Sequence, residues 1–86
     1  MNQAVKDVNS EIRVLKQILE QVREVYFSAY LANNSRKCEQ HLRRINQIEK
    51  QLEQLKEDRK FYLTKPGALE LEAYHTARHL NSVFRI

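Results

Sequence analysis

Apolar residues recur along the first third of the chain at alternating steps of four and three. The residues that follow this rhythm are Met1, Val5, Val8, Ile12, Leu15, Leu19, Val22, Tyr26 and Ala29. Such steps place successive side chains on one face of an α-helix, and their repeat of seven is typical of a coiled-coil seam. The pattern therefore predicts a helix over residues 3–32.

A second apolar stripe lies beside this seam and widens the apolar face of the first helix. Its members are Ala4, Ile18, Val25 and Ala32, with Glu11 as an interruption. A simple two-stranded zipper needs only the narrow seam, whereas a helix packed in a bundle needs a broader face. The wider face therefore favours a helical bundle.

The same rhythm returns after Asn33-Asn34-Ser35, a run that suits a helix end followed by a new N-cap. A helix over residues 35–64 is predicted, and its seam comprises Cys38, His41, Ile45, Ile48, Leu52, Leu55, Arg59 and Tyr62. Arg59 is a polar intruder that either fixes the register or packs its stem while its head reaches outward. Its place near the helix end favours the second interpretation.

Lys65-Pro66-Gly67 ends the second helix, because proline disfavours a helical residue before it and suits the first turn of a new helix. A third, shorter helix is predicted over residues 67–84. Its expected apolar face comprises Leu69, Ala73, Ala77 and Leu80, joined by Val83 and Phe84.

Short connections make neighbouring helices antiparallel. The first two helices measure about 45 Å each and the third about 27 Å, at 1.5 Å per residue. The third helix is therefore expected to start beside the N-terminus of the first and to run back about halfway along the hairpin. We predict an all-α single domain over residues 1–86, built from a long, coiled-coil-like antiparallel hairpin plus a shorter third helix, in a dimeric helical bundle.

The turn end of this hairpin is expected to lie beyond the reach of the third helix. Three aromatic residues fall there, together with two leucines, and an exposed apolar cluster of this kind marks an interaction site. The predicted partner-binding residues are Tyr26, Phe27, Tyr30, Leu31 and Leu42. The expected partner is a second copy of the chain, a helical protein, or both.

Composition excludes several classes of protein. With one Gly, one Pro and one Cys among 86 residues, the chain lacks the material for turn-rich β architectures, glycine-rich phosphate loops and disulfide frameworks. No apolar run approaches the roughly 20 residues that cross a bilayer, and no basic-then-apolar leader is present. We expect a cytoplasmic protein without membrane contact, and the lone Cys38 fits a reducing compartment.

The net charge of +4 arises in the middle segment, residues 33–65. Four cations cluster just after the predicted turn, namely Arg36, Lys37, Arg43 and Arg44. Cations near planar rings suit phosphates and bases, so nucleic-acid binding through the second helix is the alternative function. A solvated basic face explains the same charges without any ligand.

Two groups of side chains contain some of the residues that a metal site or a catalytic site requires, but neither group is complete. Glu72, His75 and His79 share a flank of the third helix, yet a metal site built on such a pair needs further ligands. Cys38 and His41 lie within reach on one helix, but no orienting group or oxyanion donor accompanies them. We therefore predict no catalytic residue, no metal and no cofactor. The predicted function is that of a non-enzymatic interaction module, such as a small adaptor, assembly chaperone or regulatory subunit.

Overall fold

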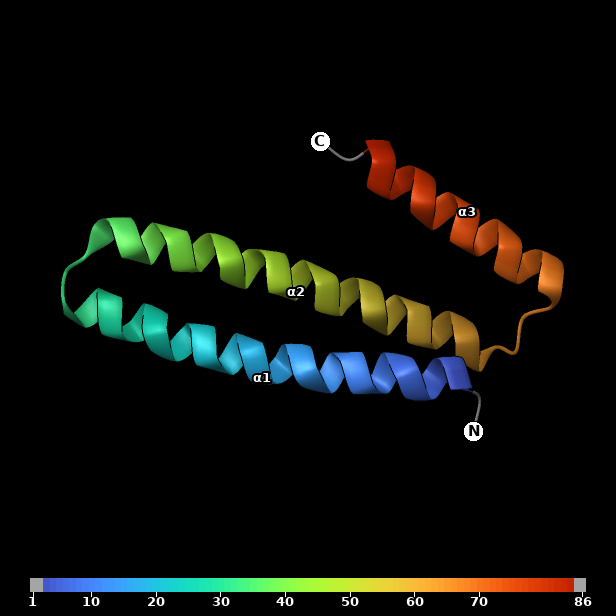
Figure 1. The fold of residues 1–86 in the computed structure, drawn as a ribbon, viewed down its shortest axis with the longest axis horizontal. Helices are drawn as coiled ribbons and strands as arrows, with labels where there is room; N and C mark the ends of the chain where they lie inside the picture. Colours follow the sequence, from blue (N-terminus) through green and yellow to red (C-terminus); the bar gives the residue numbers. More distant parts are fainter. Residues whose placement is uncertain (1–2, 85–86) are drawn as a thin grey trace.

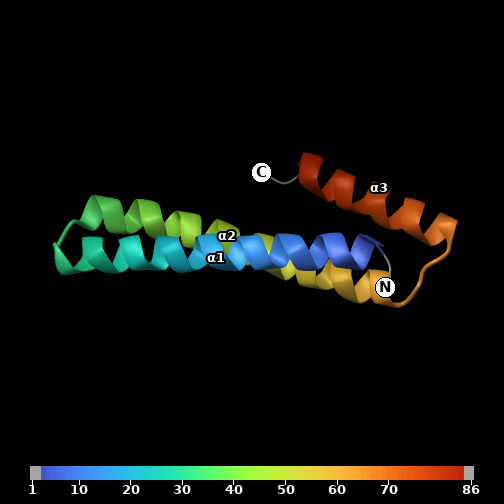
Figure 2. The same ribbon diagram turned by 60° about the horizontal axis from the view of Figure 1, so that its bottom comes forward.

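The computed structural model describes the backbone of residues 3–84 and the side chains of residues 3–81. The described chain forms three helices and no strand: α1 (Gln3–Leu31), α2 (Ser35–Leu63) and α3 (Ala68–Phe84). The predicted all-α fold is confirmed. Helices α1 and α2 lie side by side as an antiparallel hairpin, and α3 begins beyond its open end and runs back at an angle beside α2 (Figures 1 and 2).

The core lies between α1 and α2. It comprises Val5, Val8, Ile12, Leu19 and Val22 of α1 and Ile45, Ile48, Leu52, Leu55 and Tyr62 of α2. Every one of these residues belongs to a predicted seam, because steps of four and three keep one stripe of each helix turned toward the other. The sequence pattern therefore predicted the packing of the hairpin, although Met1, the first seam position, lies outside the described residues.

Arg59 is half-buried within the α2 seam. Its guanidinium donates a hydrogen bond to Asn9 Oδ1 of α1 at 3.1 Å. The charged head therefore reaches a polar partner on the neighbouring helix, and it links α1 to α2 near the open end of the hairpin.

The turn between α1 and α2 is built from two asparagines. Asn33 has a φ of 56°, in the left-handed region that asparagine tolerates better than most residues. Asn34 is the N-cap of α2, and its side chain accepts a hydrogen bond from the backbone N–H of Lys37 at 3.2 Å. These local contacts explain why the chain reverses at the predicted place.

The face that α3 turns toward the hairpin differs from the predicted one. Leu71 and Tyr74 face the hairpin, whereas Leu69 is 82% exposed. The other members of the predicted face with described side chains are also exposed, namely Ala73, Ala77 and Leu80. The side chains of Val83 and Phe84 lie outside the described part of the chain.

The physical reason for this difference lies in the contacts of α3. Among the described helices, only α1 and α2 bring their backbones close together, so α3 meets the hairpin through long side chains. The carboxylate of Asp58 on α2 accepts a hydrogen bond from Tyr74 and forms an ion pair with Arg78, both on α3. These contacts fix the rotation of α3 about its axis. Polar partners, rather than the most apolar stripe, select the packed face.

Shortening a core side chain tests the packing of the hairpin. Leu19→Ala or Ile48→Ala is expected to lower the free energy of unfolding by about 2 to 5 kcal/mol, because both side chains are buried and a cavity would remain. Urea unfolding followed by circular dichroism measures the loss. Gln17→Ala, at an exposed position, should change stability by less than about 0.5 kcal/mol, and equal losses at the two kinds of position would contradict this packing.

Candidate functional site

The last turns of α1 carry large apolar side chains in water. Phe27, Tyr30 and Leu31 are 60%, 62% and 66% exposed. Ala29 is buried and Tyr26 packs against the core, so the seam continues to the end of α1. Residues 27, 30 and 31 are rotated away from the seam, and α2 cannot cover them.

Two further exposed apolar residues lie near the same end of the hairpin. Val25 of α1 and Leu42 of α2 are each about half exposed. We call these five exposed residues the turn-end patch: Val25, Phe27, Tyr30, Leu31 and Leu42. Helix α3 lies along the opposite, open half of the hairpin and ends short of this patch (Figure 1). Tyr26, also predicted to contact a partner, is half-buried in the hairpin core.

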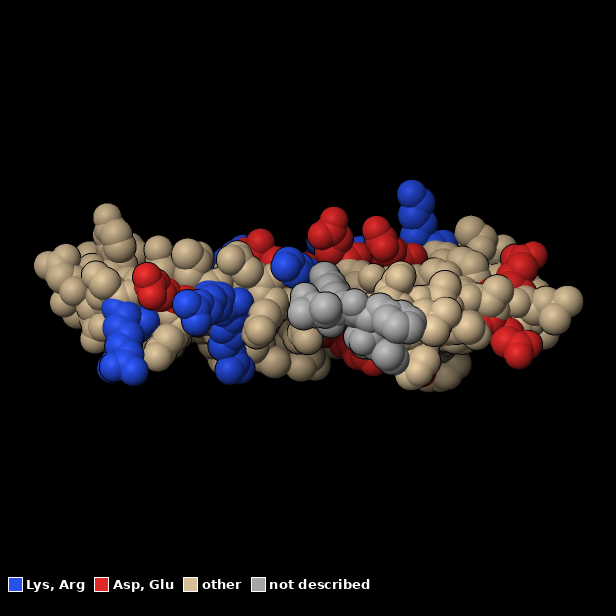
Figure 3. Space-filling view, turned by 90° about the horizontal axis from the view of Figure 1, so that it is seen from above, with Lys and Arg blue, Asp and Glu red and all other residues tan. Residues whose placement is uncertain are grey.

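The basic residues predicted as nucleic-acid contacts all lie exposed on the first half of α2: Arg36, Lys37, Arg43 and Arg44. Blue Lys and Arg side chains gather over the turn half of the face in Figure 3, with acidic groups interspersed. Glu39 is exposed among these cations, and Glu49 pairs with Arg23 of α1 at 3.5 Å. That ion pair is exposed on both sides, so it contributes little to stability.

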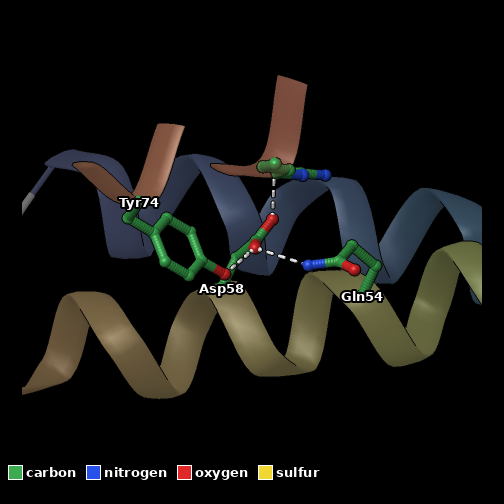
Figure 4. A network of polar contacts seen from close by, with 4 residues as sticks. Gln54, Asp58 and Tyr74 are labelled. Carbon is green, nitrogen blue, oxygen red and sulfur yellow. Dashed lines mark hydrogen bonds and ion pairs between the residues drawn. The ribbon is translucent and has the colours of Figure 1, made fainter. Parts of the chain in front are cut away.

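A buried carboxylate joins α3 to the hairpin. Asp58 is only 1% exposed, and no other described side chain is buried as completely. Its Oδ1 accepts hydrogen bonds from Gln54 Nε2 at 3.1 Å and from the Tyr74 hydroxyl, as Figure 4 shows. Its Oδ2 forms an ion pair with the Arg78 guanidinium, with Nη1 and Oδ2 2.5 Å apart. The charge of Asp58 is therefore balanced by one residue of α3.

An aromatic stack flanks this carboxylate. The ring of Tyr74 lies parallel to that of Phe61, with the centroids 4.0 Å apart and the planes inclined by 8°. Tyr62 and His75 contact the Tyr74 ring at wider angles. Apolar contact thus adds to the polar contacts where Tyr74 meets the hairpin.

Burial and the hydrogen bond to Asp58 raise the pKa of Tyr74 from 10.0 to about 12. Burial raises the pKa of Tyr62 as well, and the nearby Asp58 charge adds to that shift. Both phenols are held in the neutral form, since a phenolate beside Asp58 would place two negative charges together. The Tyr74 hydroxyl therefore acts as a donor to the carboxylate over the whole physiological range.

Asp58 is a contact residue that was not predicted from the sequence. One signal was present, because Asp58 follows Leu55 by three residues and precedes Tyr62 by four, which places it beside the α2 seam. Tyr74 and Arg78 are likewise one turn apart on α3. These spacings put the three side chains on suitable faces, but only the fold shows that the faces meet.

The structure also places the side chains that carry elements of chemistry. Within residues 3–81, no cluster of three His, Cys, Asp or Glu side chains could hold a metal ion. Of the predicted trio on α3, His75 contacts the rings of Tyr62 and Tyr74 instead. Cys38 and His41 are half-buried seam positions near the turn.

The comparisons with known proteins returned nothing for this chain: no family model, no curated protein and no solved structure matches it. Within the described residues, no helix combines the length and apolar character needed to cross a membrane. Function must therefore be argued from the surfaces and contacts themselves.

Removing the buried carboxylate tests how α3 is held. Asp58→Ala is expected to release α3, because Tyr74 and Arg78 would lose their shared partner. Hydrogen exchange of the backbone amides should accelerate in α3 and stay slow in the buried middle of α1 and α2. Glu57→Ala, at the exposed neighbouring position, is the control, and unchanged exchange in α3 of Asp58→Ala would contradict this role.

The docking of α3 should also depend on pH through Tyr74. Because the pKa of Tyr74 is raised in the folded state, its contribution is present below about pH 10 and is lost as pH rises toward about 12. Absorbance of the phenolate during an alkaline titration measures this step. Tyr74→Phe should remove the highest of the tyrosine titration steps, and a step that persists in this variant would assign it to another tyrosine.

Proposed function

We propose that this chain is a non-enzymatic protein–protein interaction module, acting in the cytoplasm as a small adaptor, assembly chaperone or regulatory subunit. The observation that carries the proposal is the turn-end patch, where Phe27, Tyr30 and Leu31 are each at least 60% exposed at the end of the hairpin that α3 does not reach. An apolar surface of this kind is typical of a binding site.

The large apolar side chains of the turn-end patch are of the kind that contributes most to binding affinity. Transfer of apolar surface from water contributes about 25 cal/mol per Å², so large side chains contribute most. Aromatic residues are enriched at the cores of protein interfaces, and tyrosine is enriched among residues whose truncation costs about 2 kcal/mol or more. Phe27 and Tyr30 therefore supply the anchors, with Leu31 beside them.

A helix is the partner that suits this site best. Two antiparallel helices with apolar side chains on their outer flanks offer half of a four-helix bundle, and a third or fourth helix completes the packing. The anchors lie three and four residues apart along α1, which matches the spacing that another helix presents. A helical segment of another protein, or of a second copy, fits these requirements.

The alternative function, nucleic-acid binding, uses the exposed cations of α2. Glu39 lies among those cations, and Glu49 lies farther along the same helix in an ion pair with Arg23. Acidic groups near a cationic surface repel phosphates and reduce the field that attracts a nucleic acid. The interspersed charges therefore favour the protein-binding function.

Truncating the two aromatic anchors tests the proposed function. The double variant Phe27→Ala with Tyr30→Ala is expected to abolish capture of a helical partner from the native cell while leaving helicity largely intact, since both side chains are exposed. Affinity capture and circular dichroism measure the two properties. Leu63→Ala is the matched control, because Leu63 is equally exposed but lies at the open end of α2.

Neutralising Arg43 and Arg44 separates the two functions. If the partner is a protein that binds the turn-end patch, Arg43→Gln with Arg44→Gln should retain most of the capture. Loss of most binding, with a flattened salt dependence, would instead establish a nucleic-acid partner and contradict the proposed function.

A further inference from the structure

Helix α3 contacts the hairpin with one side and turns a more apolar side away from it. Leu71 packs against the hairpin core, and Arg78 pairs with Asp58. On the other side of the helix, Leu69 is 82% exposed and Leu80 is 47% exposed. Within the described chain, no helix lies over that outward side (Figures 1 and 2). Its apolar residues are therefore available to a partner.

The outward residues of α3 follow the same rhythm as the two seams of the hairpin. They succeed one another at steps of four, three and four, and all of them are exposed: Leu69, Ala73, Thr76 and Leu80. Such steps keep side chains on one stripe of a helix, and this stripe lies opposite Leu71. We call these four residues the outer seam.

The outer seam is a stripe without charge. Glu70 and Glu72 are two residues apart, so they lie on its two sides and not within it. Seen from above, the half of the molecule that holds α3 is mostly uncharged, with acidic groups at its margins (Figure 3). Depletion of charged residues is typical of the core of a protein interface.

The order of residues in the outer seam is self-complementary. Read from either end, the order is large, small, small, large. When two copies of α3 lie antiparallel, Leu69 of each copy lies against Leu80 of the other. Ala73 and Thr76 pair in the same way, because the two residues are equally far from the middle of the seam. A second copy of the chain is therefore the partner that matches every position of the stripe.

The residues that flank the outer seam also suit an antiparallel pair. Glu72 and His79 are exposed and seven residues apart, on the same side of the seam. In an antiparallel pair this side meets its own counterpart, so Glu72 of each copy lies near His79 of the other. An imidazole N–H donates to a carboxylate whether the ring is charged or neutral. On the other flank, Glu70 meets the small Ala77, so no like charges face each other.

The parallel orientation lacks these matches. It would bring the acidic first turns of both α3 helices to the same end, so that four glutamates gather there. Like charges placed together across an interface are unfavourable. The charges beside the seam therefore select the antiparallel orientation.

We infer that two copies of this chain associate through their outer seams as an antiparallel two-fold dimer. The two α3 helices lie at its centre and the two hairpins lie outside, because each hairpin contacts the opposite side of its own α3. The same surface is used by both copies, so the assembly closes at two. The seam spans residues 69–80, about 17 Å along the helix, and so small a contact predicts a weak dimer.

This dimer goes beyond the proposed function, because it uses none of the five residues of the turn-end patch. The patch and the outer seam carry different residues, so each is tested by its own variants. Failure of the dimer would leave the binding role of Phe27 and Tyr30 to its own experiment.

Replacing the exposed leucines of the outer seam tests the inference on the full chain. Sedimentation equilibrium should show a dimer for the wild type. Leu69→Lys with Leu80→Lys should raise the dissociation constant about tenfold or more, because cations would face each other in place of apolar contacts.

Leu31→Lys with Leu63→Lys is the matched control for this pair of changes. It adds the same charge at leucines that are 66% and 61% exposed outside α3, and it should leave the dimer intact. A control that weakens the dimer as much as the seam variant does would overturn the inference. So would a wild type that stays monomeric at about 1 mM, where even a millimolar dissociation constant gives a detectable dimer.

A gain of affinity tests the centre of the seam. Thr76→Leu should lower the dissociation constant about tenfold, because each new side chain would cover the small Ala73 of the other copy and bury additional apolar surface. Asn81→Leu places the same side chain at an exposed position of α3 outside the seam, and it is the control. Equal effects of the two changes would overturn the inference, since added apolar surface alone would then explain them.

The orientation of the dimer is tested by disulfide formation between two variants. In a Cys38→Ser background, one chain carries Glu72→Cys and the other carries His79→Cys. The antiparallel dimer places these two positions side by side, so the mixture should form mixed disulfides faster than either variant forms disulfides with itself. Faster self-linking of either variant would indicate a parallel pair and overturn the inference.

Discussion

The apolar seam between α1 and α2 is the interaction on which the rest of the structure depends. Two helices of 29 residues each bury one stripe against the other, and these contacts supply the core of the described chain. Most of the stability of a helix in a protein comes from packing of its apolar face, so packing of the seam stabilises both helices. The turn at Asn33 and Asn34, the exposed patch and the attachment of α3 all depend on that hairpin.

Attachment of α3 follows a different physical principle from the hairpin. Asp58 is buried beside the seam, where an unpaired carboxylate would be costly, and Tyr74 and Arg78 of α3 satisfy it. The stack of Tyr74 on Phe61 adds apolar contact. Because these contacts are few and lie on one side of the helix, α3 holds one orientation yet leaves most of its own surface in water.

The unequal lengths of the helices set where the exposed surfaces lie. Phe27, Tyr30 and Leu31 stay exposed at the turn end because they are rotated away from the seam, and α3, which lies beside α2, ends before it reaches the turn. The first half of α2, with exposed Arg36, Glu39 and Arg43, is likewise left uncovered beside the turn. The exposed surfaces at the turn end therefore follow from the rotation of these residues away from the seam and from the mismatch in length between α3 and the hairpin.

The sequence by itself determined the hairpin, because a repeat of seven specifies which side of each helix is buried without reference to any distant residue. It also determined the turn at Asn33 and the exposure of Phe27 and Tyr30, which follow from their rotation away from the seam. The rotation of α3 was decided only in the tertiary structure. Leu69 and Ala73 formed the more apolar stripe, but Asp58 required partners, and a buried charge outweighs the burial of a few small or flexible apolar side chains.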